Sequence, residues 1–386
     1  MNKIVLNSEQ SKIVEYCVNN KTNVCILGEA GTGKTVVINE MVKQLNLNHK
    51  KVLKTAFQGV ASKHIDGKTI HSAFGLNFEG EQARDVKKFL KNIDVCIIDE
   101  IGMVTSNLFD KIVPIILEMK IRLIVVGDFY QITPFDGSKG KNKCKFCFQS
   151  NYWTQVLNFI NFQLTQVERQ HDEEFLRNIR LLKKGEKEAI EYIVQNMSKV
   201  RFEDEITICT LNKRADEINS KAYEKLVGEE KIFCLDEGVA KVKKGMRVMT
   251  TTNNFKAGYC NGSMGRVIGW DEYSIHVLLD TGEKVIVKPH KRYSDKSNSK
   301  ESLLTAYWGL KLAYAITIHK AQGLTFDKLN IDLGERGTWT HGQLYSAISR
   351  VRNIKNIHIE GNLYNCRIAP RKEVVDFYNE FERTIA

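Results

Sequence analysis

The chain has 386 residues, of which 42% are apolar, 27% charged and 9% aromatic, and this composition excludes a disordered protein. At about 150 residues per domain it predicts two or three globular domains. The 57 Lys and Arg exceed the 46 Asp and Glu, so the net charge of +11 favours a polyanionic partner. No apolar run reaches the roughly 18 residues of a membrane span, so we expect an intracellular protein with no membrane partner. The nine cysteines are too few for a disulfide scaffold.

The first half of the chain alternates short apolar runs with longer stretches of helical period. The runs cover residues 23–27, 52–57, 94–100 and 122–128, and helical stretches such as residues 35–45 separate them. Buried strands separated by helices are typical of βαβ units in a parallel sheet. Similar apolar runs begin at residues 206, 328 and 356. The pattern therefore predicts an α/β fold with two parallel sheets.

The segment between residues 238 and 304 does not show this alternation of strands and helices. It contains glycine-rich turns and short alternating strands without intervening helices, which predicts a small β-barrel or hairpin module inserted in the second α/β domain. The polar run that begins at Tyr293 is expected to be a mobile loop. Residues 238–300 hold 12 Lys and Arg against 5 Asp and Glu, so this segment carries +7 of the net charge. We predict that it faces a phosphate backbone, with Lys241, Lys243 and Lys244 among the contributing cations.

The strongest local motif is GEAGTGKT, residues 28–35, which follows a predicted strand and opens a predicted helix. This is the pattern of a phosphate-binding loop, in which the backbone amides surround phosphate oxygens. Lys34 supplies a positive charge to the terminal phosphates, and the Thr35 hydroxyl is a ligand for Mg²⁺. The predicted ATP-binding residues of the loop are Gly28, Ala30, Gly31, Thr32, Gly33, Lys34 and Thr35.

Two further strand ends carry polar residues suited to hydrolysis. Asp99 would hold Mg²⁺ through water, and Glu100 would orient or deprotonate the attacking water. The alternative for this pair is a helix N-cap with a first-turn acid. At the end of the next strand, the amide of Gln131 is a candidate sensor of the γ-phosphate, and a surface loop residue is its alternative.

The order of additional motifs resembles one family. These motifs are LNSEQ from Leu6, KTAFQGVASKHIDGKTIHSAFG from Lys54, LTQVERQ from Leu164, ICTLNKRADEIN from Ile208, KKGMRVMTTTN from Lys243, YCNGSMGRVIG from Tyr259, LAYAITIHKAQGLT from Leu312 and GQLYSAISRVR from Gly342. Together with the phosphate loop they resemble superfamily 1B DNA helicases of the petite-integration-frequency (PIF-type) family, related to RecD-like and Dda-like helicases. The resemblance extends from Leu6 to Arg352.

The resemblance implies two RecA-like domains with an SH3-like barrel inserted in the second. The expected boundaries are 1–165 for domain 1A, with a short wedge at about 75–93, 166–237 and 305–386 for domain 2A, and 238–304 for domain 2B. ATP would bind between the RecA-like domains, with Gln10 reading the adenine and Gln322 and Gly323 near the nucleotide. Arg169 and Arg350 would be arginine fingers from the second domain. A tail after Arg371 is expected to form one capping helix.

The implied activity is 5′ to 3′ unwinding of tailed or forked duplex DNA by a monomer that tracks single-stranded DNA, in the cytoplasm or nucleoid, or in a nucleus. The contacts are expected to be backbone hydrogen bonds and base stacking. His71 and His319 could instead be core histidines, and Phe57 and Trp339 core aromatics. The expected DNA-binding residues are Thr55, Phe57, Thr69, His71, Asn212, Lys213, Thr317, His319 and Lys320.

Several features stay open at this level. The motifs depart from the family pattern at Thr133, where a proline is usual, and at Gly102, where a serine is usual. Cys144 and Cys147 form a CxxC pair without a second ligand pair, so metal binding there is an alternative to two plain thiols. The competing functions are a nucleotide-switched single-stranded DNA clamp and an AAA+ type remodeller with a finger from a neighbouring subunit.

Overall fold

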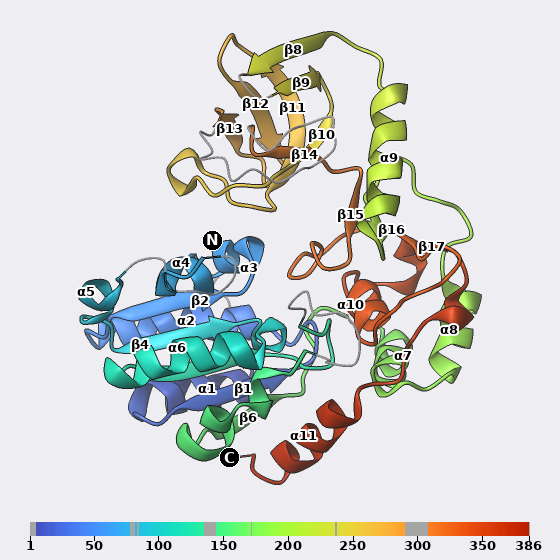
Figure 1. Cartoon of the computed structure of the whole chain (residues 1–386). Coiled ribbons are helices and arrows are strands. Elements are labelled where there is room, and N and C mark those ends of the chain that lie inside the picture. The colour runs from blue at the N-terminus through green and yellow to red at the C-terminus, as the bar shows by residue number, and fades with distance from the viewer. Residues whose placement is uncertain are drawn as a thin grey trace.

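The computed structural model describes residues 5–77, 82, 85–134, 144–170, 172–235, 238–289 and 308–385. The predicted loop from Tyr293 and part of the predicted wedge lie outside these residues. Figure 1 shows two α/β units side by side, with a β module above them. Among the described residues, no helix is both long and apolar enough to cross a membrane.

The first α/β unit is built on a six-stranded sheet in which every pair of neighbours is parallel. The four predicted strands of the first half are all present, and β3 and β6 are added at the two edges. In sheet order the strands are β3 (Lys68–Thr69), β2 (Val52–Ala56), β4 (Val95–Asp99), β5 (Arg122–Gly127), β1 (Val24–Gly28) and β6 (Ile160–Leu164).

Alternate residues of the central strands β4, β5 and β1 enter two different cores, which explains why these three strands are almost continuously apolar. Cys25 and Leu27 of β1 pack in the core that contains α6, whereas Val24 and Ile26 pack in the core that contains α1 and α2. Both faces of the sheet are therefore covered. The helices of this unit are α1 (Ser8–Asn19), α2 (Lys34–Leu47), α3 (Gly59–His64), α4 (Ile70–Phe74), α5 (Lys87–Leu90) and α6 (Ser106–Glu118).

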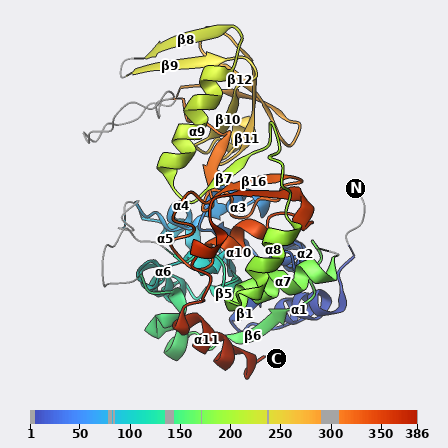
Figure 2. The same cartoon turned by 90° about the vertical axis from the view of Figure 1, so that its right-hand side faces the viewer.

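The last helix, α11 (Lys372–Glu382), returns to the first unit although the predicted boundaries place it in the second. Its buried residues Val374, Tyr378 and Phe381 belong to the same core as α6. Figures 1 and 2 both show α11 beside β6, and an isolated β-bridge joins Asn161 to Ile385. The reason is an aromatic face at helical spacing, in which Phe377 packs against an aromatic cluster of the first unit formed by Phe129, Phe148 and Trp153.

The second α/β unit has a four-stranded parallel sheet. Its strands, in sheet order, are β15 (Ala315–Thr317), β7 (Thr207–Cys209), β16 (Leu329–Asp332) and β17 (Ile357–Glu360). The three strands predicted from residues 206, 328 and 356 correspond to β7, β16 and β17. The helices of this unit are α7 (Glu173–Lys184), α8 (Glu188–Asn196), α9 (Asn212–Lys225) and α10 (Gln343–Ile348).

The β module follows α9 and precedes β15, so it is inserted within the second unit. Its main sheet is antiparallel and contains β13 (Lys284–Val287), β12 (Ile275–Leu279), β11 (Met264–Trp270), β10 (Arg247–Thr250) and β14 (Leu310–Leu312). A second, two-stranded sheet pairs β8 (Glu230–Leu235) with β9 (Gly238–Lys243). The module reaches beyond the predicted 238–304 on both sides, because β8 pairs with β9 and β14 pairs with β10.

We expect Phe381→Ala to lower the free energy of unfolding by about 3–5 kcal/mol, since it empties a buried aromatic position in the first unit's core. Glu380→Ala, one residue away on the exposed face of α11, is the matched control. Urea unfolding followed by tryptophan fluorescence measures both variants. Equal midpoints for the two would contradict the placement of α11 in this core.

Candidate active site

The phosphate loop connects β1 to α2, as predicted. Gly31 and Gly33 have φ values of 87° and 78°, a left-handed conformation that glycine adopts without strain. Lys34, the first residue of α2, folds back so that its Nζ donates to the carbonyl oxygens of Gly28 and Glu29, both at 2.9 Å. The loop is therefore closed on its own lysine, at a helix N-terminus that favours anions.

Gln10 lies beside this loop with both ends of its amide engaged. Its Oε1 accepts the Asn7 amide at 3.1 Å in a capping box of α1, and its Nε2 donates to the Thr32 carbonyl at 3.1 Å. The side chain is 3% exposed. Each end of the amide keeps one further hydrogen-bonding position, a second N–H on Nε2 and a second lone pair on Oε1, which an adenine could use.

Asp99 and Glu100 lie at the carboxyl end of β4, on the sheet edge that carries the loop. Burial raises the pKa of Asp99 to about 7, and the charge of Glu100 adds to this effect, while the Glu100 amide and the Lys34 charge oppose it. Glu100 has a φ of 53°, which is unusual for a residue with a side chain and common at functional sites. Its Oε2 accepts Gln322 Nε2 from the second unit at 3.3 Å.

The residues predicted to hold Mg²⁺ fit that ion. Asp99 offers a buried carboxylate and Thr35 a hydroxyl, which are the hard oxygen ligands that Mg²⁺ prefers, with substrate phosphates and water completing the set. Burial also lowers the pKa of Lys34, an effect opposed by the nearby carboxylates of Asp128, Glu100 and Asp99. Within the described ranges, no group of three or more His, Cys, Asp or Glu could hold a metal by itself.

Gln131 and Arg350 meet across the two units. Arg350 Nη2 donates to Gln131 Oε1 at 3.0 Å, and both side chains are 3% exposed. Burial lowers the pKa of Arg350, opposed mainly by the charge of Glu100. Gly342, just before α10, packs tightly against the loop that contains Gln131. A Cβ added to Gly342 would lie 2.1 Å from the Gln131 carbonyl oxygen. The predicted sensor and one predicted arginine finger are thus in direct contact.

Arg169 lies between β6 of the first unit and α7 of the second. It was predicted to come from the second domain, but it lies on the connector after β6, where the neighbouring Glu168 amide donates to the Gly31 carbonyl at 2.8 Å. Its Nη1 reaches the Ser349 carbonyl oxygen at 2.8 Å, next to Arg350. Burial lowers the pKa of Arg169 to about 10, and the charge of Arg350 contributes. The connector packs against the phosphate loop because it directly follows β6, the neighbour of β1.

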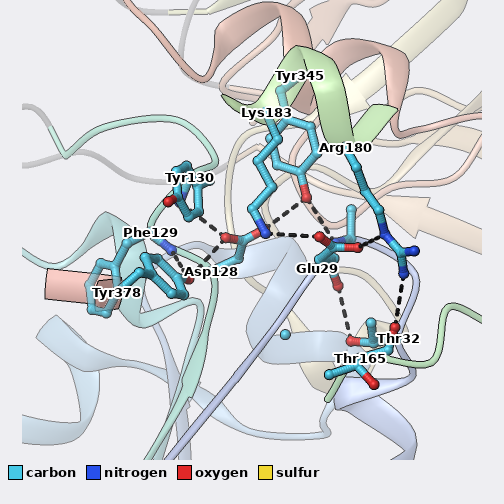
Figure 3. Close-up of polar contacts among 12 residues, drawn as sticks. Glu29, Thr32, Asp128, Phe129, Tyr130, Thr165, Arg180, Lys183, Tyr345 and Tyr378 are labelled. Atoms are coloured by element: carbon cyan, nitrogen blue, oxygen red, sulfur yellow. Dashed lines mark hydrogen bonds and ion pairs between the residues drawn. The ribbon is translucent and has the colours of Figure 1, made fainter. Parts of the chain in front are cut away.

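Two other polar groups join the units near the loop, and the sequence did not reveal them (Figure 3). Glu29, at a variable position of the phosphate-loop pattern, pairs with Lys183 at 2.9 Å and Arg180 at 3.0 Å, both on α7. Asp128 receives hydrogen bonds from Tyr345 of α10 and Tyr378 of α11. The only signal in the sequence was Glu29 itself, an acidic residue inside the loop motif. Its partners could not be identified from the sequence because they lie about 150 residues away.

The predicted DNA-binding residues of the first unit divide into two groups. Thr55 is a correction: it is fully buried in β2, and its hydroxyl donates to the Ile97 carbonyl oxygen at 2.9 Å, so it has no access to a ligand. Phe57 and His71 lie together in an edge-to-face pair, with ring centroids 6.1 Å apart, and are partly exposed. Thr69 caps α4 by accepting the Ser72 amide.

The second unit supplies a corresponding group. His319 and Trp339 stack with ring centroids 6.3 Å apart, and Trp339 is 41% exposed. Gln58 Nε2 donates to the His319 carbonyl oxygen at 2.9 Å and so links this group to the first unit. Asn212, Lys213 and Lys320 are exposed, whereas Thr317 is buried. Gly323 has a φ of 81° with open space around it, next to Gln322.

The CxxC pair does not resemble a metal centre. Cys147 is buried, its Sγ donates to the Ile101 carbonyl oxygen, and burial raises its pKa well above the usual value.

Gly102, where the family pattern has a serine, has a steric reason. A Cβ at this position would lie 2.5 Å from the Asp128 carbonyl oxygen.

The site combines a phosphate loop and acidic pair on one parallel sheet with a buried arginine that follows α10 of the second unit. This defines a P-loop nucleoside triphosphatase whose site lies between two α/β units.

The comparisons with known proteins narrow that class. A family model for PIF1-like helicases matches residues 5–201. The ATP-dependent DNA helicase Pif1 of Campylobacter jejuni is 28% identical over 399 residues, which cover 87% of this chain and 88% of that protein. The Xenopus laevis helicase PIF1 is 29% identical over 399 residues, covering 92% of this chain and 61% of that protein. A crystal structure of Bacteroides Pif1 with ADP-AlF3 and single-stranded DNA has a TM-score of 0.81 at 26% identity, covering 99% of this chain and 98% of that chain.

The chain belongs to the PIF1-like helicase family. Its α/β architecture of two RecA-like units agrees with the solved Pif1 structures, so the predicted family and fold class are confirmed. The SH3-like character of the inserted module stays a prediction.

We expect Glu29→Gln to lower the free energy of unfolding by about 2 kcal/mol at pH 7, between the values typical of exposed and buried ion pairs. Burial by itself would raise the pKa of Glu29, but Lys183 and Arg180 lower it below its usual value. The ion pair therefore stabilises the fold above the unfolded-state pKa near 4.5, and this stabilisation is lost as the pH falls through the lower folded-state pKa.

The measurement is urea unfolding of wild type and Glu29→Gln at several pH values between 7 and 3. Glu40→Gln, which removes an exposed pair with Lys43 on α2, is the control and should have a smaller effect. A difference between wild type and Glu29→Gln that persists unchanged at the acid end would contradict this assignment.

Proposed function

We propose that this chain hydrolyses Mg-ATP between its two α/β units and uses the resulting opening and closing to move 5′ to 3′ along single-stranded DNA and unwind duplexes. The chain is an ATP-dependent DNA helicase, as its family membership implies. The observation that carries the mechanism is the contact of Gln131 with Arg350, because it joins a sensor on one unit to an arginine on the other.

The catalytic roles follow from the positions of the charged groups. The loop amides and Lys34 bind the β- and γ-phosphates, and Lys34 releases its two loop carbonyls to do so. Glu100 orients the attacking water and accepts its proton. Arg350 and Arg169 stabilise negative charge that develops on the transferred phosphoryl group. When bound, Mg²⁺ held by Asp99 and Thr35 would supply charge neutralisation between the phosphates.

Turnover changes the contacts between the units. Gln131 Nε2, which has a second N–H besides the one that faces Asp128, can donate to a phosphate oxygen, and Gln322 can release Glu100 in the same step. Loss of the γ-phosphate removes the negative charge that draws the arginines inward. The closed cleft therefore depends on the nucleotide, and movement of one unit relative to the other follows hydrolysis.

We place the DNA strand along the edge where both units present exposed rings and amines. The first unit contributes Phe57, Thr69 and His71, and the second contributes His319 and Lys320, with Trp339 as a stacking platform. Burial lowers the pKa of His71 and of His319, so both rings are neutral hydrogen-bonding and stacking groups at pH 7. Asn212 and Lys213 extend this path toward the β module.

A single chain contains every predicted catalytic group, which favours a monomer over the AAA+ alternative. The presence of Glu100, of the buried Arg350 and of the half-buried Arg169 favours hydrolysis over a passive clamp. A DNA substrate would place the chain in the cytoplasm or nucleoid, or in a nucleus.

The test is unwinding of duplexes that carry a single-stranded tail at either the 5′ or the 3′ end. Wild type should unwind the 5′-tailed duplex with single-strand-stimulated ATP hydrolysis, and Lys34→Ala should reduce hydrolysis by at least about 100-fold because the phosphates lose their cation. Lys43→Ala, an exposed lysine of the same helix, should behave as wild type. Hydrolysis that is indifferent to DNA, or preference for the 3′ tail, would refute the proposal.

The charge of the β module makes a separate prediction. Lys241 and Lys244 are exposed, but Lys243 is engaged: its Nζ donates to the carbonyl oxygens of Tyr223 and Leu226 at the end of α9. We therefore expect Lys241→Ala combined with Lys244→Ala to reduce the salt slope of DNA binding by up to ~1.4, at ~0.7 per phosphate contact of a single strand.

The slope is obtained from titrations of a fluorescent oligonucleotide at several salt concentrations. Lys243→Ala, which removes a helix cap, should leave the slope unchanged and lower the thermal unfolding temperature. An unchanged slope in the double variant would mean that these charges only aid solubility.

A further inference from the structure

Tyr345 of α10 reaches across the cleft into the phosphate loop. Its hydroxyl oxygen accepts the Ala30 amide at 3.1 Å, and its proton is donated to Asp128 Oδ2 at 2.9 Å. The side chain is 3% exposed. Burial raises the pKa of Tyr345 well above its usual value, so the hydroxyl keeps the proton that it donates. One atom of the second unit thus bonds to two segments of the first.

Asp128 connects that hydroxyl to the sensor. Its Oδ2 also receives Gln131 Nε2 at 3.4 Å, and Gln131 Oε1 in turn accepts Arg350 Nη2 at 3.0 Å. The bonds form a continuous path from the phosphate loop through Tyr345, Asp128 and Gln131 to Arg350. Tyr345 and Arg350 belong to the same short segment of the second unit, so both side chains leave the first unit together when the cleft opens.

Tyr378 of α11 makes the same pair of bonds on the other side of Asp128. Its hydroxyl donates to Asp128 Oδ1 at 3.2 Å and accepts the Phe129 amide at 3.2 Å (Figure 3). It differs in one respect: α11 is packed in the core of the first unit. The Tyr378 bonds therefore persist when the units separate, whereas the Tyr345 bonds break.

We propose that Tyr345 is a positioning residue of the hydrolysis cycle, whose hydroxyl ties the phosphate loop to Asp128 in the closed cleft and so holds Gln131 against Arg350. The proposal rests on the proposed function of the site. Tyr345 touches neither the phosphates nor the attacking water in this assignment. It acts through Asp128, which needs its donors because it is a buried carboxylate, 2% exposed.

The arrangement makes closure of the cleft and alignment of the sensor a single event. An open cleft leaves Asp128 Oδ2 without the tyrosine donor, so the Gln131 amide is held less firmly. A closed cleft restores the donor and aligns Gln131. Loss of the hydroxyl should therefore impair the chemical step, which needs the closed cleft, more than it impairs nucleotide binding to the loop.

The experiment compares Tyr345→Phe with Tyr378→Phe and wild type in steady-state ATP hydrolysis with saturating single-stranded DNA. Tyr345→Phe should lower kcat by about 10-fold and change KM by less than about 3-fold, as expected for loss of one hydrogen bond to a charged group in the closed state. Tyr378→Phe should retain kcat within about 2-fold. Both variants keep the ring and should lose similar thermal stability, since each removes one donor from Asp128.

A second measurement uses ADP with aluminium fluoride as a mimic of the closed state. Tyr345→Phe should bind it about 10-fold more weakly in the presence of DNA while its affinity for ADP alone is unchanged. A kcat equal to or above that of wild type, or equal losses in the two tyrosine variants, would overturn the proposal. A wild type without DNA-stimulated hydrolysis would instead refute the proposed function, before either variant is compared.

Discussion

A buried carboxylate must be surrounded by donors, and the structure around the cleft depends on how Asp128 meets this requirement. Tyr130 and Tyr378 supply an amide and a hydroxyl to one oxygen, and Tyr345 and Gln131 supply donors to the other. These groups come from the first sheet, the second α/β unit and the C-terminal helix. One side chain therefore holds together three parts of the chain that are distant in sequence, at the point where the nucleotide site is formed.

The same region concentrates charge that water does not screen. Lys34, Arg169 and Arg350 are all cations whose pKa is lowered by burial, and Asp99 is an acid whose pKa is raised by burial. Each group is destabilised in its charged form by lost solvation and needs a partner of opposite sign. A triphosphate with a divalent cation supplies both signs of charge. This explains why a set of charged groups that have lost solvation is suited to binding that ligand, and why their contacts change when the γ-phosphate is lost.

Local sequence was sufficient for the central strands and for the phosphate-loop motif. The phosphate loop was predictable because its glycines, lysine and hydroxyl must be adjacent to wrap one phosphate, so the whole site element lies within residues 28–35. The strands were predictable because both faces of a parallel sheet are covered and the strands become continuously apolar. The role of Arg350 came from motif order rather than from any local pattern, and its contact with Gln131, more than 200 residues away, is shown only by the structure.

The chain by itself thus determined the central strands of both α/β units, the position of the phosphate-loop motif and the family that the motifs resemble. Only the tertiary structure decided that α11 joins the first unit, that Thr55 is sealed inside a sheet, that Lys243 caps α9 and that Arg169 lies on a connector beside the loop. The physical reason is the same in each case. Hydrogen bonds and apolar contacts between distant segments select among several places that a local pattern permits, and a pattern of neighbouring residues contains no information about which distant partner is present.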